Sequence, residues 1–483
     1  MNMYEKLLEY GDSDIYPMHM PGHKRNPKFQ MKNPYGIDVT EAEGMDDLHN
    51  PRGMIRHLMD KMKEHYGTRE TYILVNGSTC GILAAISACC RRGDGILVDR
   101  NCHRSVYHAI YLMGLTPIYL YREIDAGNGI PLGLKAVEAE RALSRETLPE
   151  GITISAAVVT SPTYEGVVSE IKEMAELLHR RGIALIVDGA HGAHLSWGHP
   201  LDEAFPASAV ELGADVVVES LHKMLPALTQ TAVLHLCSGR VPPEKLARYL
   251  DIYETSSPSY VLMASVSQCM KWLEKYSREV FPAYGDRLRQ FYKEAGKWHS
   301  LLLWDVPCRD LSKLVLQTGC GGMDGCRLAE RLREKYKIET ELALPEYVLA
   351  MTSPCDTGEG LKRLSDALGE LDNASEGRKG QKKERFQSIA ALPRARVRLG
   401  IYEAMNGEIQ RVSLEESMGR VSAEYAFIYP PGVPFLVPGE EITREAAAWI
   451  REAGKRKLRL QGLSDTAASS ILVCVMRGEK GDG

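Results

Sequence analysis

Five short runs of Val, Ile and Leu recur between residues 70 and 240, and a helical-looking segment follows each of them. The apolar residues in these runs are continuous rather than alternating, which is typical of strands buried on both faces. Strands that alternate with helices build βαβ units around a parallel sheet. The sequence therefore predicts an α/β fold with a mostly parallel sheet flanked by helices. The predicted strands are 72–75, 96–98, 156–159, 183–187 and 216–218.

Each of these predicted strands ends in a cluster of small and polar residues. Open α/β sheets bind their ligands at the carboxyl ends of the strands. We therefore expect one functional site to be assembled from the clusters at these ends, which are 76–79, 99–103, 160–166, 188–191 and 219–223.

The rest of the chain divides into further segments. Apolar residues at helical spacing predict a long helix over 262–300. Residues 373–385 are charged and nearly free of apolar side chains, which is typical of a linker. The expected parts are an N-terminal arm (1–50), a large domain (51–300), a smaller α+β domain (301–372), the linker (373–385) and a C-terminal domain (386–483).

The charge balance excludes some classes of partner. The 59 Lys and Arg residues nearly match the 64 Asp and Glu residues, so the net charge is −5. This balance argues against binding to nucleic acid or to a membrane surface. Residues 1–10 lack the apolar core of a signal peptide, and no apolar run approaches the ~18 residues of a membrane span. We therefore expect a soluble, cytoplasmic protein.

Two features of the sequence bear on metal binding, and both are weak evidence for a metal site. The eleven cysteines include no Cys-x-x-Cys pair, which indicates reduced thiols rather than a zinc site. His191, His194 and His199 lie close together in the sequence, but no acidic residue accompanies them as in zinc hydrolases. We expect no metal.

Two residues at the predicted strand ends are candidates for catalysis. Lys223 follows a buried strand, with Ser220 and His222 just before it, and partial desolvation makes a lysine amine nucleophilic. A solvated surface lysine is the alternative. Asp188 ends the most apolar strand, where a carboxylate can pair with the pyridinium nitrogen of a cofactor. Its alternative role is to cap the following helix.

Two further strand ends carry groups that suit a phosphorylated, planar cofactor. Ser78 and Thr79 open a helix directly after a strand, and hydroxyls with free N–H groups at such a point form a phosphate site. An Asn-Gly turn with a Ser/Thr cap explains them equally well. His103 follows another strand, where its ring can lie over a planar cofactor or be part of the core.

Taken together, seven motifs in order resemble those of the Orn/Lys/Arg decarboxylases. These are pyridoxal-phosphate (PLP) enzymes of the aspartate-aminotransferase fold, known as PLP fold type I, with smaller C-terminal domains. The motifs span residues 21 to 440, which is most of the chain. They are Pro21-Gly22-His23-Lys24, Asp46-Asp47-Leu48-His49, Asn101 to Ser105, Thr163-Tyr164-Glu165-Gly166, Val187 to His194, Glu219 to Lys223, and Tyr429 to Glu440.

The resemblance implies a role for each matched residue. Lys223 would bond covalently to PLP, Asp188 would hold the pyridine nitrogen, and His103 would stack on the ring. Ser256 would reach the phosphate of a neighbouring subunit, which makes a homodimer or a higher homo-oligomer the expected catalytic unit. The other implied cofactor contacts are Ser78, Thr79, Ala190, Ser220 and His222.

The implied reaction is decarboxylation of a basic L-amino acid (arginine, lysine or ornithine) to its amine and CO₂, in polyamine-related metabolism. Lys223 or His222 would return the proton to Cα. A basic substrate needs an acid for its distal cation, and the candidates are Asp46, Asp47, Glu165 and Glu440, of which Glu440 is favoured because it stands in a family motif. For each of them a solvated surface carboxylate is the alternative. An aminotransferase or lyase on the same fold is the second hypothesis, and a binding protein without activity is the third.

Longer members of the family resemble this chain less closely at two points. They carry an additional receiver-like domain before the first motif, which begins here at residue 21, so the compact form of the family is expected. They also tend to have tryptophan where this chain has His191. The resemblance further implies that the N-terminal arm contributes to the active site.

Overall fold

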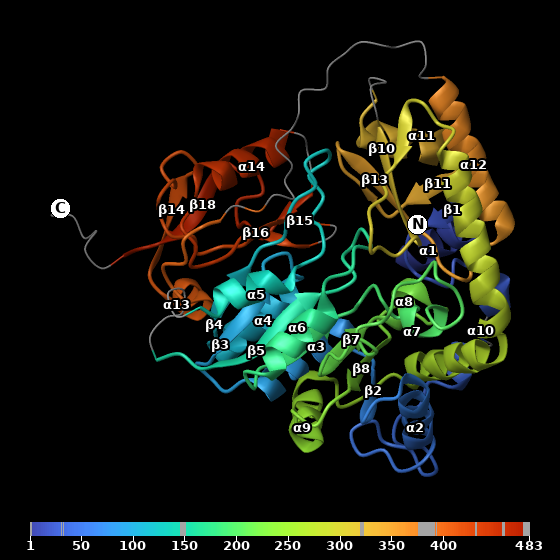
Figure 1. Cartoon of the computed structure of the whole chain (residues 1–483), viewed down its shortest axis with the longest axis horizontal. Coiled ribbons are helices and arrows are strands. Elements are labelled where there is room, and N and C mark those ends of the chain that lie inside the picture. Colours follow the sequence, from blue (N-terminus) through green and yellow to red (C-terminus); the bar gives the residue numbers. More distant parts are fainter. Residues whose placement is uncertain are drawn as a thin grey trace. The chain divides into compact units, whose positions relative to one another are not determined.

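The structure of the chain is a computed structural model (Figure 1). Its contacts divide the chain into two compact units, which we describe separately. The first unit comprises Met1–Ala84, Ser161–Ala175 and Val187–Phe386, and the second comprises Ala85–Thr160, Glu176–Ile186 and Gln387–Gly483. The structure describes residues 2–29, 31, 33–144, 151–318, 323–374, 392, 394–429, 432–455 and 459–476. The predicted linker lies outside the described residues from 375 on, and the predicted domain boundaries stay a prediction.

The predicted sheet is confirmed as a seven-stranded sheet with the order β2-β8-β7-β6-β5-β3-β4. Strand β3 pairs in parallel with β4 and β5, whereas β8 pairs antiparallel with β2 and β7. Every residue of β3, β6, β7 and β8 is buried, which explains their continuous apolar runs. The strands are β2 (Glu70–Leu74), β3 (Gly95–Asp99), β4 (Thr116–Leu120), β5 (Ile154–Thr160), β6 (Ala184–Asp188), β7 (Val216–Glu219) and β8 (Ala232–Leu236).

Two strands of this sheet were not predicted. Strand β4 contains Pro117, which lacks a backbone N–H and is unusual within a sheet, although β4 lies at the edge where proline is tolerated. Strand β8 contains His235, which interrupts an otherwise apolar run and is completely buried. The ring of His235 is accommodated there by a 2.9 Å hydrogen-bond contact between its Nδ1 and Oγ1 of Thr71 in β2.

Helices connect and flank the strands of this sheet, as the βαβ pattern predicts (Figure 1). Two of these helices carry predicted site residues in their first turns, directly after a strand. Helix α3 follows β2, and α8 follows β7. These helices are α3 (Gly77–Cys89), α4 (Arg104–Met113), α5 (Ala136–Ala142), α6 (Ile171–His179), α7 (Leu195–Gly198), α8 (Leu221–Met224) and α9 (Pro243–Tyr253).

The predicted long helix is α10 (Tyr260–Ala295). It begins at Ser259, whose hydroxyl accepts a hydrogen bond from the Leu262 N–H at 3.3 Å. Its buried side, which includes Leu273, Phe281 and Leu288, forms part of the main hydrophobic core of the first unit.

A smaller α+β part follows α10 in the first unit. Its antiparallel sheet has the order β12-β13-β10-β9, and its strands are β9 (Leu301–Leu303), β10 (Lys313–Thr318), β12 (Leu342–Ala343) and β13 (Tyr347–Met351). Its helices are α11 (Gly325–Tyr336) and α12 (Gly358–Asn373). Strand β11 (Ile338–Thr340) pairs in parallel with β1 (Tyr16–Met18), so the N-terminal segment is anchored to this part of the chain.

The N-terminal segment is mostly irregular. Its helical elements are α1 (Met3–Gly11), the short 3₁₀ turns η1 (Pro27–Phe29) and η2 (Pro34–Gly36), and α2 (Met54–Tyr66). Helix α2 presents Ile55, Met59 and Met62 to the core.

The C-terminal part of the second unit has its own apolar core, which includes Phe435, Trp449 and Ile450. Its strands form two small sheets, with the orders β14-β18 and β16-β15-β17. The elements are α13 (Ile401–Asn406), β14 (Ile409–Ser413), β15 (Ala426–Ile428), β16 (Pro434–Leu436), α14 (Arg444–Lys455), β17 (Leu460–Gln461) and β18 (Ser470–Cys474).

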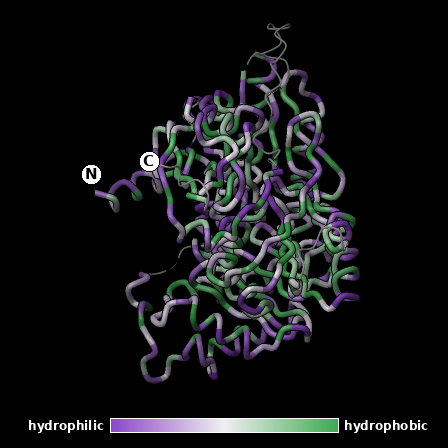
Figure 2. Tube along the Cα trace, turned by 90° about the vertical axis from the view of Figure 1, so that its left-hand side faces the viewer, coloured by the Kyte–Doolittle hydropathy of each residue, from purple (hydrophilic) through white to green (hydrophobic). Residues whose placement is uncertain are grey.

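Hydrophobic and hydrophilic residues alternate in short stretches along the trace (Figure 2). Among the described residues, no helix is long and apolar enough to cross a membrane.

Candidate active site

Lys223 lies in α8, immediately beyond the carboxyl end of β7. Its Nζ is 3.1 Å from Nε2 of His191. Burial lowers the pKa of the Lys223 amine, while the nearby carboxylates of Asp188 and Glu341 oppose that shift. A lysine whose pKa is lowered has a larger fraction of unprotonated, nucleophilic amine. The geometry therefore suits covalent attack on a carbonyl group.

The turn after β6 carries Asp188 and His191 at the carboxyl end of the sheet, where Lys223 also lies. Asp188 is buried, and its Oδ1 accepts a hydrogen bond from the Ala190 N–H at 3.2 Å. The next residue, Gly189, donates its N–H to the Val218 carbonyl of β7 at 2.9 Å. Because β7 leads directly into α8, this backbone bond fixes the turn beside the helix that carries Lys223. Asp188 thus lies close enough to Lys223 for its charge to act on the Lys223 amine.

Two serine hydroxyls meet at the start of α3. The Ser220 hydroxyl donates to Oγ of Ser78 at 3.0 Å. Helix α3 begins at Gly77, whose φ of 74° is a conformation that favours glycine. Thr79 lies in the first turn of the same helix and is exposed. Hydroxyls beside the free N–H groups of a helix N-terminus suit a phosphate group.

A buried glutamate holds the segment before α3 against the segment that follows α9. Oε1 of Glu254 accepts hydrogen bonds from the N–H groups of Val75 at 2.8 Å and Asn76 at 3.3 Å. Ser256 follows Glu254 by two residues and is exposed. The predicted reach of Ser256 to a neighbouring subunit stays a prediction.

His222 is held in place by hydrogen-bond contacts to the backbone of two distant residues. Its Nδ1 contacts the Thr231 carbonyl at 2.8 Å, so Nδ1 carries the proton. Burial lowers its pKa to about 4. The His222 carbonyl accepts the Gly22 N–H at 2.7 Å, and a Cβ at Gly22 would come within 2.6 Å of the Leu225 nitrogen. The Pro-Gly-His-Lys motif thus needs glycine because its backbone lies directly against α8.

His103 lies in the second unit and caps α4. Its Nδ1 is 3.0 Å from Oγ of Ser105 and 3.3 Å from the Ser105 nitrogen. Gly432 of the Tyr429 to Glu440 motif lies nearby, since a Cβ built there would be 3.8 Å from Cδ2 of His103. The stacking of His103 on a cofactor ring stays a prediction.

Three of the acids that were predicted to bind the distal cation, Glu440, Glu165 and Asp46, have other partners. Both oxygens of Glu440 accept hydrogen bonds from Arg100, at 3.1 and 3.0 Å, and both side chains are buried. Glu165 accepts a hydrogen bond from the Tyr347 hydroxyl at 2.8 Å. Asp46 caps α2. These contacts favour structural roles for the three acids, and in particular for Glu440.

Asp46 accepts hydrogen bonds from four backbone N–H groups at the start of α2, those of residues 52, 53, 55 and 56, at 2.8 to 3.2 Å. Burial acts to raise its pKa, but these N–H groups outweigh burial and lower it. We expect Asp46→Ala to lower the free energy of unfolding by about 1–2 kcal/mol at neutral pH, the usual loss for an N-terminal cap. Because the folded pKa is lowered, this contribution should disappear as the pH falls through it.

Urea unfolding of the Asp46→Ala protein at neutral and acidic pH measures this loss. Asp38→Ala, in an exposed stretch, is the control and should leave the midpoint unchanged. Equal stability of the Asp46→Ala protein and the wild type, combined with a raised KM, would instead place Asp46 at the substrate.

Two residues near Lys223 were missed by sequence reasoning about the site. His191 was included in a strand-end cluster and a family motif and was considered as a weak metal ligand, but it was given no role beside Lys223. Glu341 lies between β11 and β12, far along the chain, and follows none of the strands of the large sheet. Its Oε1 accepts the Tyr164 hydroxyl at 2.6 Å and its Oε2 accepts the Met20 N–H at 2.9 Å. The ring of Tyr164 also contacts His191 edge-on, with centroids 5.0 Å apart.

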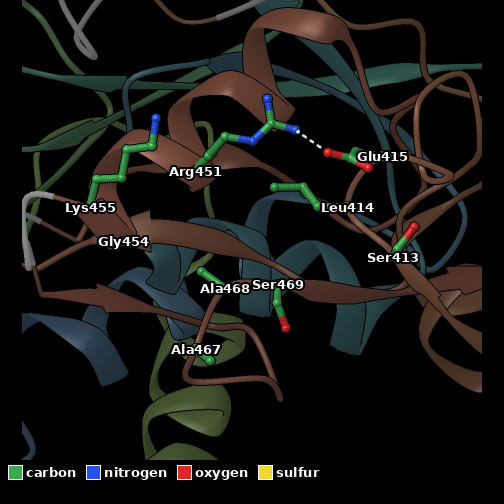
Figure 3. A pocket seen from close by; sticks show the side chains of 9 residues that line it. All are labelled: Ser413, Leu414, Glu415, Arg451, Gly454, Lys455, Ala467, Ala468 and Ser469. Atoms are coloured by element: carbon green, nitrogen blue, oxygen red, sulfur yellow. Dashed lines mark ion pairs between the residues drawn. The ribbon is translucent and has the colours of Figure 1, made fainter.

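A cavity of about 500 Å³ lies in the C-terminal part of the second unit and contains none of the predicted site residues (Figure 3). Arg451 and Lys455 of α14 extend along it, and Arg451 is 3.6 Å from the exposed Glu415. In the described part of the chain, no group of three or more His, Cys, Asp or Glu side chains is arranged to hold a metal ion.

Comparison with known proteins identifies the same family that the sequence motifs resemble. Residues 2–284 match the Orn/Lys/Arg decarboxylase major domain, and residues 380–462 match the C-terminal domain of the same family. A Bacillus subtilis protein named YaaO is 33% identical over 98% of both chains. A Bacillus subtilis arginine decarboxylase is 31% identical, covering 98% of this chain and 97% of that protein.

The solved structure of the constitutive lysine decarboxylase of E. coli superimposes with a TM-score of 0.75 over 98% of this chain and 81% of that one, at 19% identity. A serine palmitoyltransferase of Sphingomonas wittichii has a TM-score of 0.58 over 75% of this chain. These likenesses agree with the predicted PLP fold type I. On the two domain matches and the full-length relatives, the chain belongs to the Orn/Lys/Arg decarboxylase family.

Proposed function

We propose that this protein decarboxylates a basic L-amino acid with PLP as cofactor. The observation that carries the proposal is the partly buried Lys223 amine, which lies 3.1 Å from Nε2 of His191 and is influenced by the charge of Asp188. The set of donors fits PLP, since it includes an amine for the aldehyde, a carboxylate for the pyridine nitrogen and a pair of hydroxyls for the phosphate. Bound PLP supplies an electron sink for the electron pair that remains when CO₂ leaves.

The residues of the chain then have distinct tasks. Asp188 holds the proton on the pyridine nitrogen. Ser78 and Ser220 bind the phosphate together with the N-terminus of α3. Lys223 and His191 share a hydrogen-bond contact and are placed to hold the proton that is returned to Cα. His222 is less suited to this transfer, because its proton is on Nδ1 and engaged with the Thr231 carbonyl.

For the distal cation of the substrate, we propose Glu341. Its carboxylate acts electrostatically on Lys223, and it is held in place by the Tyr164 hydroxyl and the Met20 N–H. Each oxygen uses one lone pair in these bonds, so capacity remains to accept from an ammonium or guanidinium group. Glu440, Asp46 and Glu165 are each committed to other groups.

We expect Glu341→Gln to lower kcat/KM for the basic amino acid by about 10- to 100-fold, since a hydrogen bond to a charged group contributes about 1.5–3 kcal/mol. The loss should be much smaller for norleucine, which has no distal charge. Steady-state kinetics with both amino acids measure the effect. Glu339→Gln, in β11 and paired with Arg333, is the matched control and should behave like the wild type. An equal loss for both amino acids would rule out distal-cation binding by Glu341.

The reaction is tested by incubating the PLP-loaded protein with arginine, lysine and ornithine separately and identifying the products by mass spectrometry. Agmatine, cadaverine or putrescine would establish both the reaction and the substrate. A keto acid without amine would instead favour the aminotransferase alternative.

We also propose that the working unit is a homodimer, in which Ser256 contacts the phosphate bound by the other copy. The exposure of Ser256 in one chain supports this arrangement. The eleven cysteines of the sequence include no Cys-x-x-Cys pair, which supports reduced thiols in a compartment such as the cytoplasm. Light scattering of the purified protein measures its oligomeric state, and a monomer with full activity would contradict the proposed role of Ser256.

A further inference from the structure

The lysine of the Pro-Gly-His-Lys motif is buried, and its ammonium group bonds to the protein backbone. Nζ of Lys24 donates to two carbonyls, that of His19 at 2.8 Å and that of Met351 at 2.7 Å. The first bond closes the segment 19–24 on itself, and the second ties it to the last residue of β13. A charged donor makes stronger hydrogen bonds than a neutral one. Lys24 therefore anchors the 19–24 segment to the small α+β part.

The backbone at this lysine has a conformation that depends on such an anchor. Lys24 and Arg25 have φ of 54° and 53°, in the left-handed region that residues other than glycine seldom adopt. Such a conformation persists where the surrounding contacts fix it, and it is frequent at functional sites. A second contact fixes the segment two residues earlier, because the Ser353 hydroxyl donates to the Gly22 carbonyl at 2.6 Å. Lys24 and Ser353 thus hold the same short segment.

The same segment contacts both ends of the proposed substrate site. The Met20 N–H donates at 2.9 Å to Oε2 of Glu341, the acid proposed for the distal cation. The Gly22 N–H donates at 2.7 Å to the carbonyl of His222, directly before Lys223. Two N–H groups that are two residues apart therefore bind the acid and the helix that carries the reactive amine. The span between Glu341 and Lys223 depends on this segment.

We propose that Lys24 is a positioning residue that selects the length of the substrate. By anchoring the 19–24 segment, it fixes how far Glu341 lies from Lys223, so the preferred amino acid is the one whose side chain spans that distance. A misplacement of about 1 Å in a catalytic site can cost about 100-fold in rate, so a fixed span distinguishes side chains that differ by one methylene group. The inference rests on the proposed function, because substrate length matters only if Glu341 binds the distal cation.

The anchoring is tested on the full-length protein before PLP is added, so no activity is needed. Hydrogen–deuterium exchange is followed by peptide mass spectrometry in the wild type, Lys24→Met and Ser353→Ala. Methionine fills a similar space to lysine but donates no hydrogen bond. We expect peptides that cover 17–25 to exchange about 10- to 100-fold faster in Lys24→Met, which loses a charged donor, and about 2- to 10-fold faster in Ser353→Ala, which loses a neutral one. Peptides that cover β6 should be unchanged.

The consequence for specificity is measured as kcat/KM of the PLP-loaded protein. The amino acids compared differ by one methylene group, lysine with ornithine or arginine with homoarginine, according to which the wild type prefers. We expect the preference to fall by about 10-fold in Lys24→Met, since one methylene group is worth about 10- to 200-fold in a fitted site. Lys24→Arg keeps a charged donor and should restore part of the preference. Lys28→Met, an exposed lysine of η1, is the matched control and should equal the wild type in both measurements.

Unchanged exchange of the 17–25 peptides in both variants would overturn the proposal. Equal acceleration of the β6 peptides would also overturn it, because the loosening would then be general rather than local. Faster exchange with an unchanged preference, or with an equal loss for both amino acids, would overturn the role in length selection. If the wild type releases no CO₂ from any basic amino acid, the proposed function fails, while local loosening in Lys24→Met would still support the anchoring.

Discussion

Replacing Lys223 with alanine is expected to lower the rate of decarboxylation by at least about 100- to 10,000-fold, the range that a single proton-transfer group contributes. The loss has two causes in the site. The proposed covalent attachment point for PLP is removed, and so is the amine that lies 3.1 Å from His191 and that we propose returns a proton. Release of CO₂ from the preferred basic amino acid, at saturating PLP, measures the effect.

The fold of the Lys223→Ala protein should survive, because Lys223 is only partly buried and an amine whose pKa is lowered by desolvation contributes little to stability. Its melting temperature before PLP is added should therefore lie close to that of the wild type. Lys335→Ala, an exposed lysine of α11 that pairs with Glu370, is the control and should leave the rate unchanged. Retention of most of the activity by Lys223→Ala would contradict the assignment of this lysine.

The second large effect is expected on stability. Glu440→Gln should lower the free energy of unfolding by about 3–5 kcal/mol, because it leaves a buried charge without its partner. Arg100 is completely buried, donates to both oxygens of Glu440, and also donates to the Pro434 carbonyl at 2.5 Å. The Arg100–Glu440 ion pair connects the end of β3, just before His103, to the segment that contains the Tyr429 to Glu440 motif.

Urea unfolding monitored by circular dichroism measures this loss. The neighbouring Glu441→Gln is a matched control, because Glu441 is paired with the half-exposed Arg398 and should contribute less than about 1 kcal/mol. Replacing both members of the buried pair, as in Arg100→Met with Glu440→Leu, should restore much of the stability. If Glu440→Gln is as stable as the wild type but has a raised KM for the amino acid, Glu440 binds substrate after all.

The parts of the fold that depend on local pattern could be predicted from the sequence. Buried strands produce continuous apolar runs, and β2, β3, β5, β6 and β7 were identified from them. Strand β8 was missed because His235 breaks its run, and only its pairing with β2 and β7 shows why that residue is tolerated. The placement of Lys223 and Asp188 at one sheet edge followed from the rule for open α/β sheets.

The residues that were missed belong to contacts between distant segments. Glu341 lies in the small α+β part, and no spacing in the sequence relates it to Lys223. Conversely, Glu440 stands in a family motif, which identifies the family but does not reveal that the carboxylate is buried against Arg100. Burial and pairing distinguish a structural carboxylate from one that can accept a substrate, and neither can be read from residue type alone.

The central claim is tested most directly with arginine, lysine and ornithine labelled with carbon-13 in the carboxyl group, in deuterium oxide. For one of the three, the PLP-loaded protein should release labelled CO₂ and an equimolar amount of amine that carries one deuterium at the former Cα, and Lys223→Ala should release almost none. A product that keeps the labelled carboxyl group, or no turnover of any of the three by protein with PLP bound at Lys223, would contradict the account.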